Sequence, residues 1–376
     1  MAVFGREPVV SGNSKSYIKL GWVRRIKDAE PLDTEESIRR YVRCQIFCLL
    51  GSTLFTDKST AYAHAKYLPL LRDFERIHTY SWGLACLAHF YRALCRASRY
   101  DTKEMDDPLN LLFVWAWERM PCLAPVPRHT LPPAEIPVAM RWSHSERTTS
   151  WLAKTVANFR VDIDYMQEFE WRPYEGMIIP NELHGHLDVC DTVAPLLSFE
   201  CIEWHPADQV MRQFGFAQPP PQGARGIPLD QHCLALRGVQ QHDWTVLHGP
   251  WIVEWGNMRN TRLRDLHPLP TWDFIPSTEY RDWYVRSFGH MLRLSEYSPP
   301  ERFTAARIDS CRSEIIPTPS FLTTCIRRFL RKKCHASAVS PSTKAKAIGT
   351  IFWFPSCATA TISVPLYLPY RCVPST

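Results

Sequence analysis

Glycine is scarce in this sequence, and the glycine motifs of nucleotide-binding sites are absent. The chain has 15 glycines in 376 residues, below the usual share of about 7%. It contains no Gly-x-Gly-x-x-Gly, no Walker loop, no Gly-x-Ser-x-Gly elbow and no His-Glu-x-x-His pair. These absences argue against the dinucleotide-binding, P-loop, α/β-hydrolase and zinc-peptidase classes.

Lysine is missing from the whole of residues 155–331. A pyridoxal-phosphate enzyme holds its cofactor as a Schiff base on a lysine. None of the earlier lysines stands in a recognisable cofactor context, and the sequence therefore predicts no cofactor. Those earlier lysines are Lys15, Lys19, Lys27, Lys58, Lys66, Lys103 and Lys154.

Acidic residues are absent after Glu314, where eight basic residues remain. Setting those eight aside from the 44 basic residues leaves 36 against 38 acidic ones, a net charge of −2 for residues 1–314. The body is thus nearly neutral although the chain carries +6, and its overall charge indicates no nucleic-acid-binding face.

Signs of an oxidising compartment are also missing. The 13 cysteines show no repeated short spacing, no Asn-x-Ser/Thr site occurs, and Met1–Lys19 lacks the apolar stretch of a signal peptide. The one long uncharged run, Ala347–Tyr370, contains three prolines, which disfavour a membrane-spanning helix. We expect reduced thiols, a cytosolic or nuclear protein and no membrane partner.

What the chain does have is proline and helical periodicity. Its 31 prolines exceed the usual share of about 5% and cluster in residues 121–137 and Gln218–Gly226, which predicts extended connectors. Asp33 and Glu36 have the spacing of a capping box ahead of a helix over 34–55. Further helices are predicted over Tyr67–Ile77, Ser81–Ala97, Leu109–Arg119, Trp151–Met166, Leu196–Phe214 and Tyr280–Met291. Another is predicted to start at Pro250, with Gly249 as its cap.

These patterns predict a mainly α protein, an irregular multi-helix single domain with Pro-rich connectors and a disordered C-terminal tail. Its divisions are 1–33, the helical body 34–295, and a tail over 296–376. Within the body we expect Trp82, Phe90 and Trp115 to be buried together, because two apolar helices joined by a short acidic loop should pack on each other.

One group of residues has the chemistry of a zinc site, since imidazole and thiolate are the ligands that zinc prefers. It has no Cys-x-x-Cys pair, and ordinary polar or buried side chains explain it better, so we predict less than one zinc per chain. The group comprises His184, His186, Cys190, Cys201 and His205.

A second group is acidic and would suit general acid–base chemistry or a divalent ion. Glu200, Glu203 and Asp208, with His205, are the residues that would carry such a reaction. On the predicted helix Glu200 and Glu203 share a face, where pairing with Arg212 is the better interpretation. We therefore assign no catalytic residue.

Several long Trp-rich blocks, in order along the chain, resemble the plant mobile domain, also called the aminotransferase-like plant mobile domain. They include Tyr67–Phe74, Tyr80–Gly83, Val114–Arg119, Phe169–Tyr174 and Phe199–His205. The family includes the MAINTENANCE OF MERISTEMS proteins and the serine/threonine-protein phosphatase 7 long-form homologues. The resemblance implies a domain shared with transposable elements, and nuclear relatives in meristem maintenance and transposon silencing.

The resemblance brings no catalytic mechanism, and the residues supply none: metallophosphatase signatures are absent, and the lysines do not support the aminotransferase label. We expect a non-enzymatic nuclear interaction module. Its expected partners are other nuclear proteins, such as a phosphatase 7-like protein or a second plant mobile domain protein. The alternatives are a metal-assisted phosphoryl or nucleic-acid enzyme at the acidic and histidine residues, and a direct DNA-binding protein.

Residues 1–33 resemble the end of a family segment whose earlier part would precede Met1. The sequence therefore predicts that the apolar face of the 34–55 helix is left partly uncovered, with Phe47, Leu50 and Leu54 beyond the stripe that its neighbours can bury.

Overall fold

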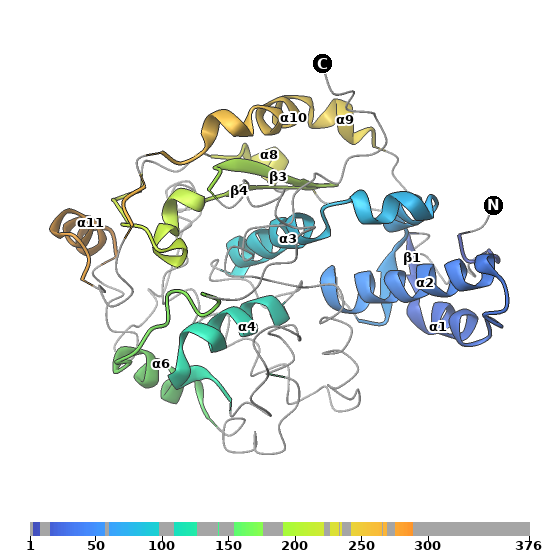
Figure 1. Cartoon of the computed structure of the whole chain (residues 1–376), viewed down its shortest axis with the longest axis horizontal. Coiled ribbons are helices and arrows are strands. Elements are labelled where there is room, and N and C mark those ends of the chain that lie inside the picture. The colour runs from blue at the N-terminus through green and yellow to red at the C-terminus, as the bar shows by residue number, and fades with distance from the viewer. Residues whose placement is uncertain are drawn as a thin grey trace.

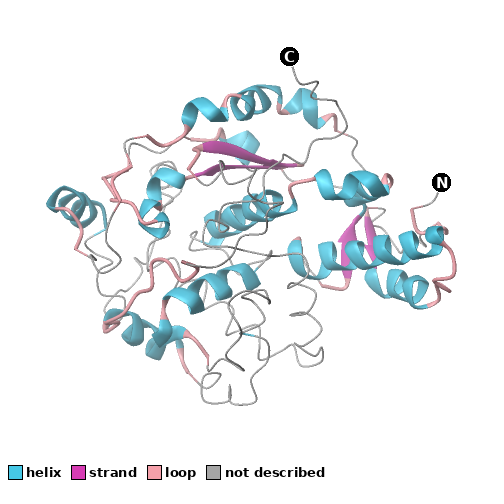
Figure 2. Ribbon diagram, viewed as in Figure 1, coloured by secondary structure: helices cyan, strands magenta, loops and turns pink. Residues whose placement is uncertain are grey.

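The computed structural model describes residues 3–7, 16–56, 60–97, 109–125, 142, 154–175, 191–221, 226–232, 234, 242–264, 266–268 and 275–288. Helices predominate there, with two short two-stranded sheets (Figures 1 and 2), and the mainly α fold class is confirmed. No helix in these ranges is long and apolar enough to cross a membrane. The expected tail over 296–376 lies outside the described residues.

Residues 3–86 build a first hydrophobic core, which we call the N-terminal cluster. Strand β1 (Tyr17–Lys19) pairs antiparallel with β2 (Tyr62–His64). Helix α1 (Leu20–Asp28) lies along α2 (Glu35–Leu49), and both present apolar side chains to this core.

The predicted 34–55 helix is present, as α2 followed by a π-helical turn over Leu50–Leu54. Its capping box lies one residue beyond the predicted one. The Thr34 hydroxyl accepts from the Ser37 N–H at 3.2 Å, and the Ser37 hydroxyl accepts from the Thr34 N–H at 3.1 Å. Asp33 instead accepts from the Ser37 hydroxyl at 3.4 Å.

The expectation of an uncovered face on this helix is wrong. Phe47, Leu50 and Leu54 are all buried in the N-terminal cluster. The Phe4 ring packs edge-on against Phe47 with centroids 5.3 Å apart, and α1 contributes Val23 to the same core. Residues that precede α2 in the chain therefore supply part of the cover, and later residues of the same cluster supply the rest.

The predicted helix over Tyr67–Ile77 is instead two 3-10 helices, η2 (Ala65–Leu71) and η3 (Phe74–Thr79). Pro69 cannot donate to the carbonyl four residues earlier, which disfavours an α-helix here. The Asp73 side chain then accepts from the Glu75 N–H at 3.2 Å and starts a new turn.

The predicted helices over Ser81–Ala97 and Leu109–Arg119 are confirmed as α3 (Trp82–Ala97) and α4 (Leu109–Arg119). They join η4 (Pro121–Leu123) and α6 (Val156–Asp164) in a second core, the central cluster. The helix predicted from Trp151 begins only at Val156, because Thr155 caps it by accepting from the Asn158 N–H at 3.2 Å.

The prediction that Trp82, Phe90 and Trp115 are buried together is wrong, because α3 contributes side chains to both cores. Phe90 is buried in the central cluster, and Trp115 packs at its margin, partly buried, with its indole N–H donating to Gln213 at 3.0 Å. Trp82, two turns earlier on α3, packs on the N-terminal cluster and donates to the Ile77 carbonyl at 2.8 Å.

The predicted helix over Leu196–Phe214 is also wrong. Its first half is an antiparallel hairpin of β3 (Ala194–Ser198) and β4 (Cys201–His205), followed by the 3-10 turns η7 (Ala207–Gln209) and η8 (Met211–Phe214). Ser198 pairs with Cys201, leaving a two-residue turn. The hairpin lies over α3 (Figure 1).

Short helices cover the outer side of the hairpin (Figure 1). They are α8 (Leu229–His232), α9 (Trp244–Leu247) and α10 (Gly249–Gly256). Next in the chain come η9 (Met258–Thr261) and α11 (Thr278–Phe288), and α11 lies to one side of the hairpin (Figure 1). The helix expected at Pro250 begins one residue earlier, with His248 as its N-cap in place of Gly249.

Candidate functional site

The β3–β4 hairpin carries most of the polar residues that the sequence singled out. Successive side chains of a strand point to opposite faces, so Cys201, Glu203 and His205 share one face of β4. All three are buried, and β4 packs on α3. Polar groups therefore lie inside the molecule, where each requires a partner.

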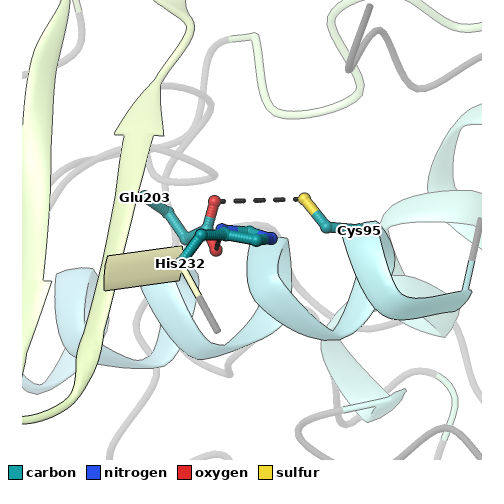
Figure 3. A group of neighbouring side chains, drawn as sticks. All are labelled: Cys95, Glu203 and His232. Atoms are coloured by element: carbon teal, nitrogen blue, oxygen red, sulfur yellow. Dashed lines mark hydrogen bonds and ion pairs between the residues drawn. The ribbon is translucent and has the colours of Figure 1, made fainter. Parts of the chain in front are cut away.

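Glu203 has two close neighbours from distant parts of the chain (Figure 3). Its Oε2 accepts a hydrogen bond from the Cys95 thiol of α3 at 3.9 Å, and its Oε1 lies 3.2 Å from Nδ1 of His232 at the end of α8. Only 3% of Glu203 is exposed. The three ligand atoms lie within 4.8 Å of one another.

Arg92, one turn before Cys95 on α3, fixes the backbone around this group. Its guanidinium donates to the carbonyl oxygens of Glu200 and His232 at 2.7 Å each, and also to that of Leu234. One buried side chain thereby joins α3, the hairpin turn and the end of α8.

Glu200, at the hairpin turn, forms an ion pair with Lys66 of η2. The ammonium donates to both carboxylate oxygens, at 2.7 and 2.8 Å. Burial by itself would raise the pKa of the Glu200 carboxyl. The Lys66 charge and the nearby His89 outweigh burial and lower this pKa to about 2. The pair joins the N-terminal cluster to the hairpin.

Phe199, the other turn residue, adopts a positive φ of 52°. This left-handed conformation is uncommon for a residue with a bulky side chain. Contacts on several sides hold it: the ring packs against Tyr67 and Trp244, and the carbonyl accepts from the His248 imidazole at 2.6 Å. Contacts of Phe199 with Tyr67, Trp244 and His248 therefore hold the turn in this conformation.

His205 lies at the far end of β4, fully enclosed. Burial lowers the pKa of its imidazole to about 4, so the ring is neutral at physiological pH. Neither ring nitrogen has a hydrogen-bond partner among the described residues. A group so placed is not open to a substrate.

Comparison with known proteins gives the family. The plant mobile domain model matches residues 4–285. This chain belongs to the plant mobile domain family. No solved structure matches it.

Three curated relatives come from Arabidopsis thaliana. The serine/threonine-protein phosphatase 7 long form homolog is 30% identical over 322 residues, which are 80% of this chain and 23% of that protein. Protein MAIN-LIKE 1 is 30% identical over 55% of this chain and 40% of its own length. Protein MAINTENANCE OF MERISTEMS is 27% identical over 49% of this chain and 38% of its length. This plant mobile domain protein thus spans less than half the length of each.

The predicted acidic group does not form one site in this plant mobile domain protein. Glu200 and Glu203 were expected on one helix face, but Glu200 lies in the turn and pairs with Lys66, whereas Glu203 faces Cys95 and His232. Asp208 lies in η7. Arg212 stacks over Trp171 and donates to the Ile275 carbonyl at 2.9 Å.

The predicted metal group is described only in part. Cys201 and His205 lie on one face of β4, with Glu203 between them. His184, His186 and Cys190 lie outside the described residues, and that group stays a prediction. Cys95 and His232, which do meet Glu203, were missed. No spacing could reveal them, since Cys95 and Glu203 are 108 residues apart.

Proposed function

We propose that this plant mobile domain protein is a nuclear protein-interaction module without catalytic activity of its own. The observation that carries the proposal is the two-sided character of α9 and α10. On the inner side, Trp255 is buried and Trp251 packs edge-on against Trp204 of β4. On the outer side, Val246 is 77% exposed and Val253 is 65% exposed.

We infer that the exposed apolar residues Val246, Leu247 and Val253 of α9 and α10 belong to one surface that a partner covers. The residues that could carry a reaction are not exposed to a substrate. Glu203 and His205 are buried, and Glu200 forms an ion pair with Lys66. A reacting group must be within reach of its substrate. Recognition by the outer helices therefore fits this molecule better than catalysis at the hairpin.

The relatives support the same proposal. This chain matches between 23% and 40% of the length of the three relatives, so the region acts as one part of longer proteins there. The names of two relatives connect one with meristem maintenance and the other with a phosphatase. A phosphatase 7-like protein or a second plant mobile domain protein is therefore the partner we propose.

The surface can be tested with the double variant Val246→Asp/Val253→Asp in the full chain. We expect its yield of co-purified nuclear protein to fall at least about tenfold, because two charges would be desolvated at the contact. Val161→Asp is the matched control, since Val161 is an exposed valine on α6. Circular dichroism should show both folded. Equal recovery of partners by the double variant and the control would contradict the proposal.

Nuclear localisation needs a separate test. The tail, outside the described residues, carries Arg327, Arg328 and the run Arg331–Lys333, which have the composition of an import signal. We expect a fluorescent fusion of the full chain to accumulate in the nucleus. A fusion truncated after Ser298 tests the basic run: loss of accumulation assigns import to the tail, and retention assigns it to the body. Cytoplasmic full-length protein would contradict the nuclear proposal.

A further inference from the structure

Cys95, Glu203 and His232 form a cluster whose donor atoms are those of a zinc site. Each comes from a different element, α3, β4 and α8, and the three side chains converge in Figure 3. A thiolate, a carboxylate and an imidazole are all established ligands of this ion. The cluster shares no residue with the zinc group that the sequence indicated, and only Glu203 with the acidic group.

The distances suit a single ion. With zinc–ligand bonds of about 2.0–2.3 Å in a tetrahedron, neighbouring ligand atoms lie about 3.3–3.6 Å apart. Here Glu203 Oε1 is 3.2 Å from His232 Nδ1, and Glu203 Oε2 is 3.9 Å from Cys95 Sγ. The three ligand atoms now lie within 4.8 Å of one another, so side-chain movements on the order of 1 Å would bring all three into coordination.

The charge balance of the cluster is an independent argument. Glu203 is 97% buried, and among the described residues His232 is the only side chain within ion-pairing distance of it. Its Oε1 accepts no hydrogen bond from any described residue. A carboxylate so deeply buried is costly unless a cation balances it.

Arg92 does not supply that cation, because both of its terminal NH₂ groups donate to backbone carbonyls and not to Glu203. Those contacts hold the backbone of His232 and of the hairpin turn that precedes β4. Such supporting contacts keep ligand side chains in place around an ion.

We propose that Cys95, Glu203 and His232 bind one Zn²⁺ ion. The Cys95 thiol gives its proton to solvent on binding, Glu203 binds as the carboxylate and His232 as the neutral ring. The two negative charges of the ligands balance the charge of the ion. Three protein ligands leave one position for water.

The ion would join α3, β4 and α8. Because it binds the folded chain only, zinc stabilises the protein by mass action. This role is independent of the α9–α10 surface, so the metal experiment and the interaction experiment can fail separately.

The first test uses the full-length protein, stripped with EDTA and titrated with ZnCl₂ against a chromophoric chelator. In place of the less than one zinc per chain expected from the sequence, we now expect one high-affinity zinc per chain, because Cys95, Glu203 and His232 meet in the fold. We also expect a higher unfolding temperature with zinc than with EDTA. With CoCl₂ we expect a thiolate-to-cobalt charge-transfer band in the near ultraviolet. A wild-type protein that binds no zinc, or a cobalt spectrum without that band, would overturn the proposal.

Variants assign the ligands. Cys95→Ser and His232→Asn should each lower zinc affinity by at least about 100-fold, more than the loss of a supporting residue. The controls are Cys86→Ser, a buried thiol on the same helix, and His242→Asn, a histidine ahead of α9. Zinc affinity equal to wild type in the two ligand variants would sink the assignment. Should a ligand variant fail to fold, alkylation of the wild-type thiols with and without zinc decides: zinc-dependent protection of Cys95 supports the assignment, and its absence contradicts it.

Discussion

Replacing Lys66 with alanine is expected to lower the free energy of unfolding by about 3–5 kcal/mol, the usual cost of leaving one member of a buried ion pair unpaired. The Lys66 and Glu200 side chains are only 11% and 17% exposed. Without the ammonium, the carboxylate would remain charged between the two cores. Urea unfolding at neutral pH measures the loss.

A double variant separates the lost charge from lost packing. Lys66→Met/Glu200→Gln removes both charges and keeps most of the volume, so it should be more stable than Lys66→Ala alone. If the double variant were as unstable as the single one, packing rather than the ion pair would account for the effect.

The same pair makes stability depend on pH. The pKa of the Glu200 carboxyl is about 2 when folded, below its ordinary value of 4.5. A lowered folded pKa stabilises the protein above pH 4.5, and this contribution is lost as the pH falls towards 2. We expect wild type to exceed Glu200→Gln by about 3 kcal/mol at pH 7 and the gap to close in that window. Glu35→Gln is the control, because Glu35 pairs with Arg39 on the surface.

The second large effect is expected at Gly51, in the π-helical turn after α2. A Cβ atom there would lie 2.3 Å from the Cβ of Ala63 and 3.0 Å from its Cα. Neither atom belongs to a flexible side chain, so the turn and strand β2 would have to separate. Gly51→Ala should therefore cost about 3 kcal/mol, the upper end for overpacking, as a lower midpoint in urea.

Ala63→Gly provides the matched test, because it removes the nearest clashing atom. In the Gly51→Ala background it should recover part of the lost stability, although in the wild type it is expected to be destabilising. Strictly additive effects of the two changes would show that the close approach of Gly51 to β2 is not the cause.

Sequence periodicity predicted the long helices of this fold well. In α2, α3 and α4 apolar residues recur at helical spacing, and each segment is a helix in the structure. The β3–β4 hairpin was missed for two physical reasons. Its strands are buried on both faces, and Glu203 and His205 break the continuous apolar run that marks such a strand. Its turn, Phe199–Glu200, contains none of the Gly, Asn or Asp that two-residue turns favour.

Only one residue of the candidate site, Glu203, could be predicted from the sequence. Glu203 was singled out by its chemistry, but its neighbours Cys95 and His232 are brought to it by tertiary packing. Likewise, the sequence placed Glu200 near Arg212, whereas the fold pairs it with a lysine 134 residues away. Spacing along a chain reports contacts within an element, and every contact of this site joins different elements.

The docked hairpin turn also bears on how the chain acquires its structure. All the buried members of the N-terminal cluster precede residue 87, whereas its ion pair to Glu200 spans 134 residues. During synthesis the first core can therefore collapse on local contacts while the turn has yet to leave the ribosome. Closing so long a loop is slow compared with helix formation. Until Glu200 arrives, Lys66 stays hydrated, and the contact between the two cores remains open to water after the first core has formed.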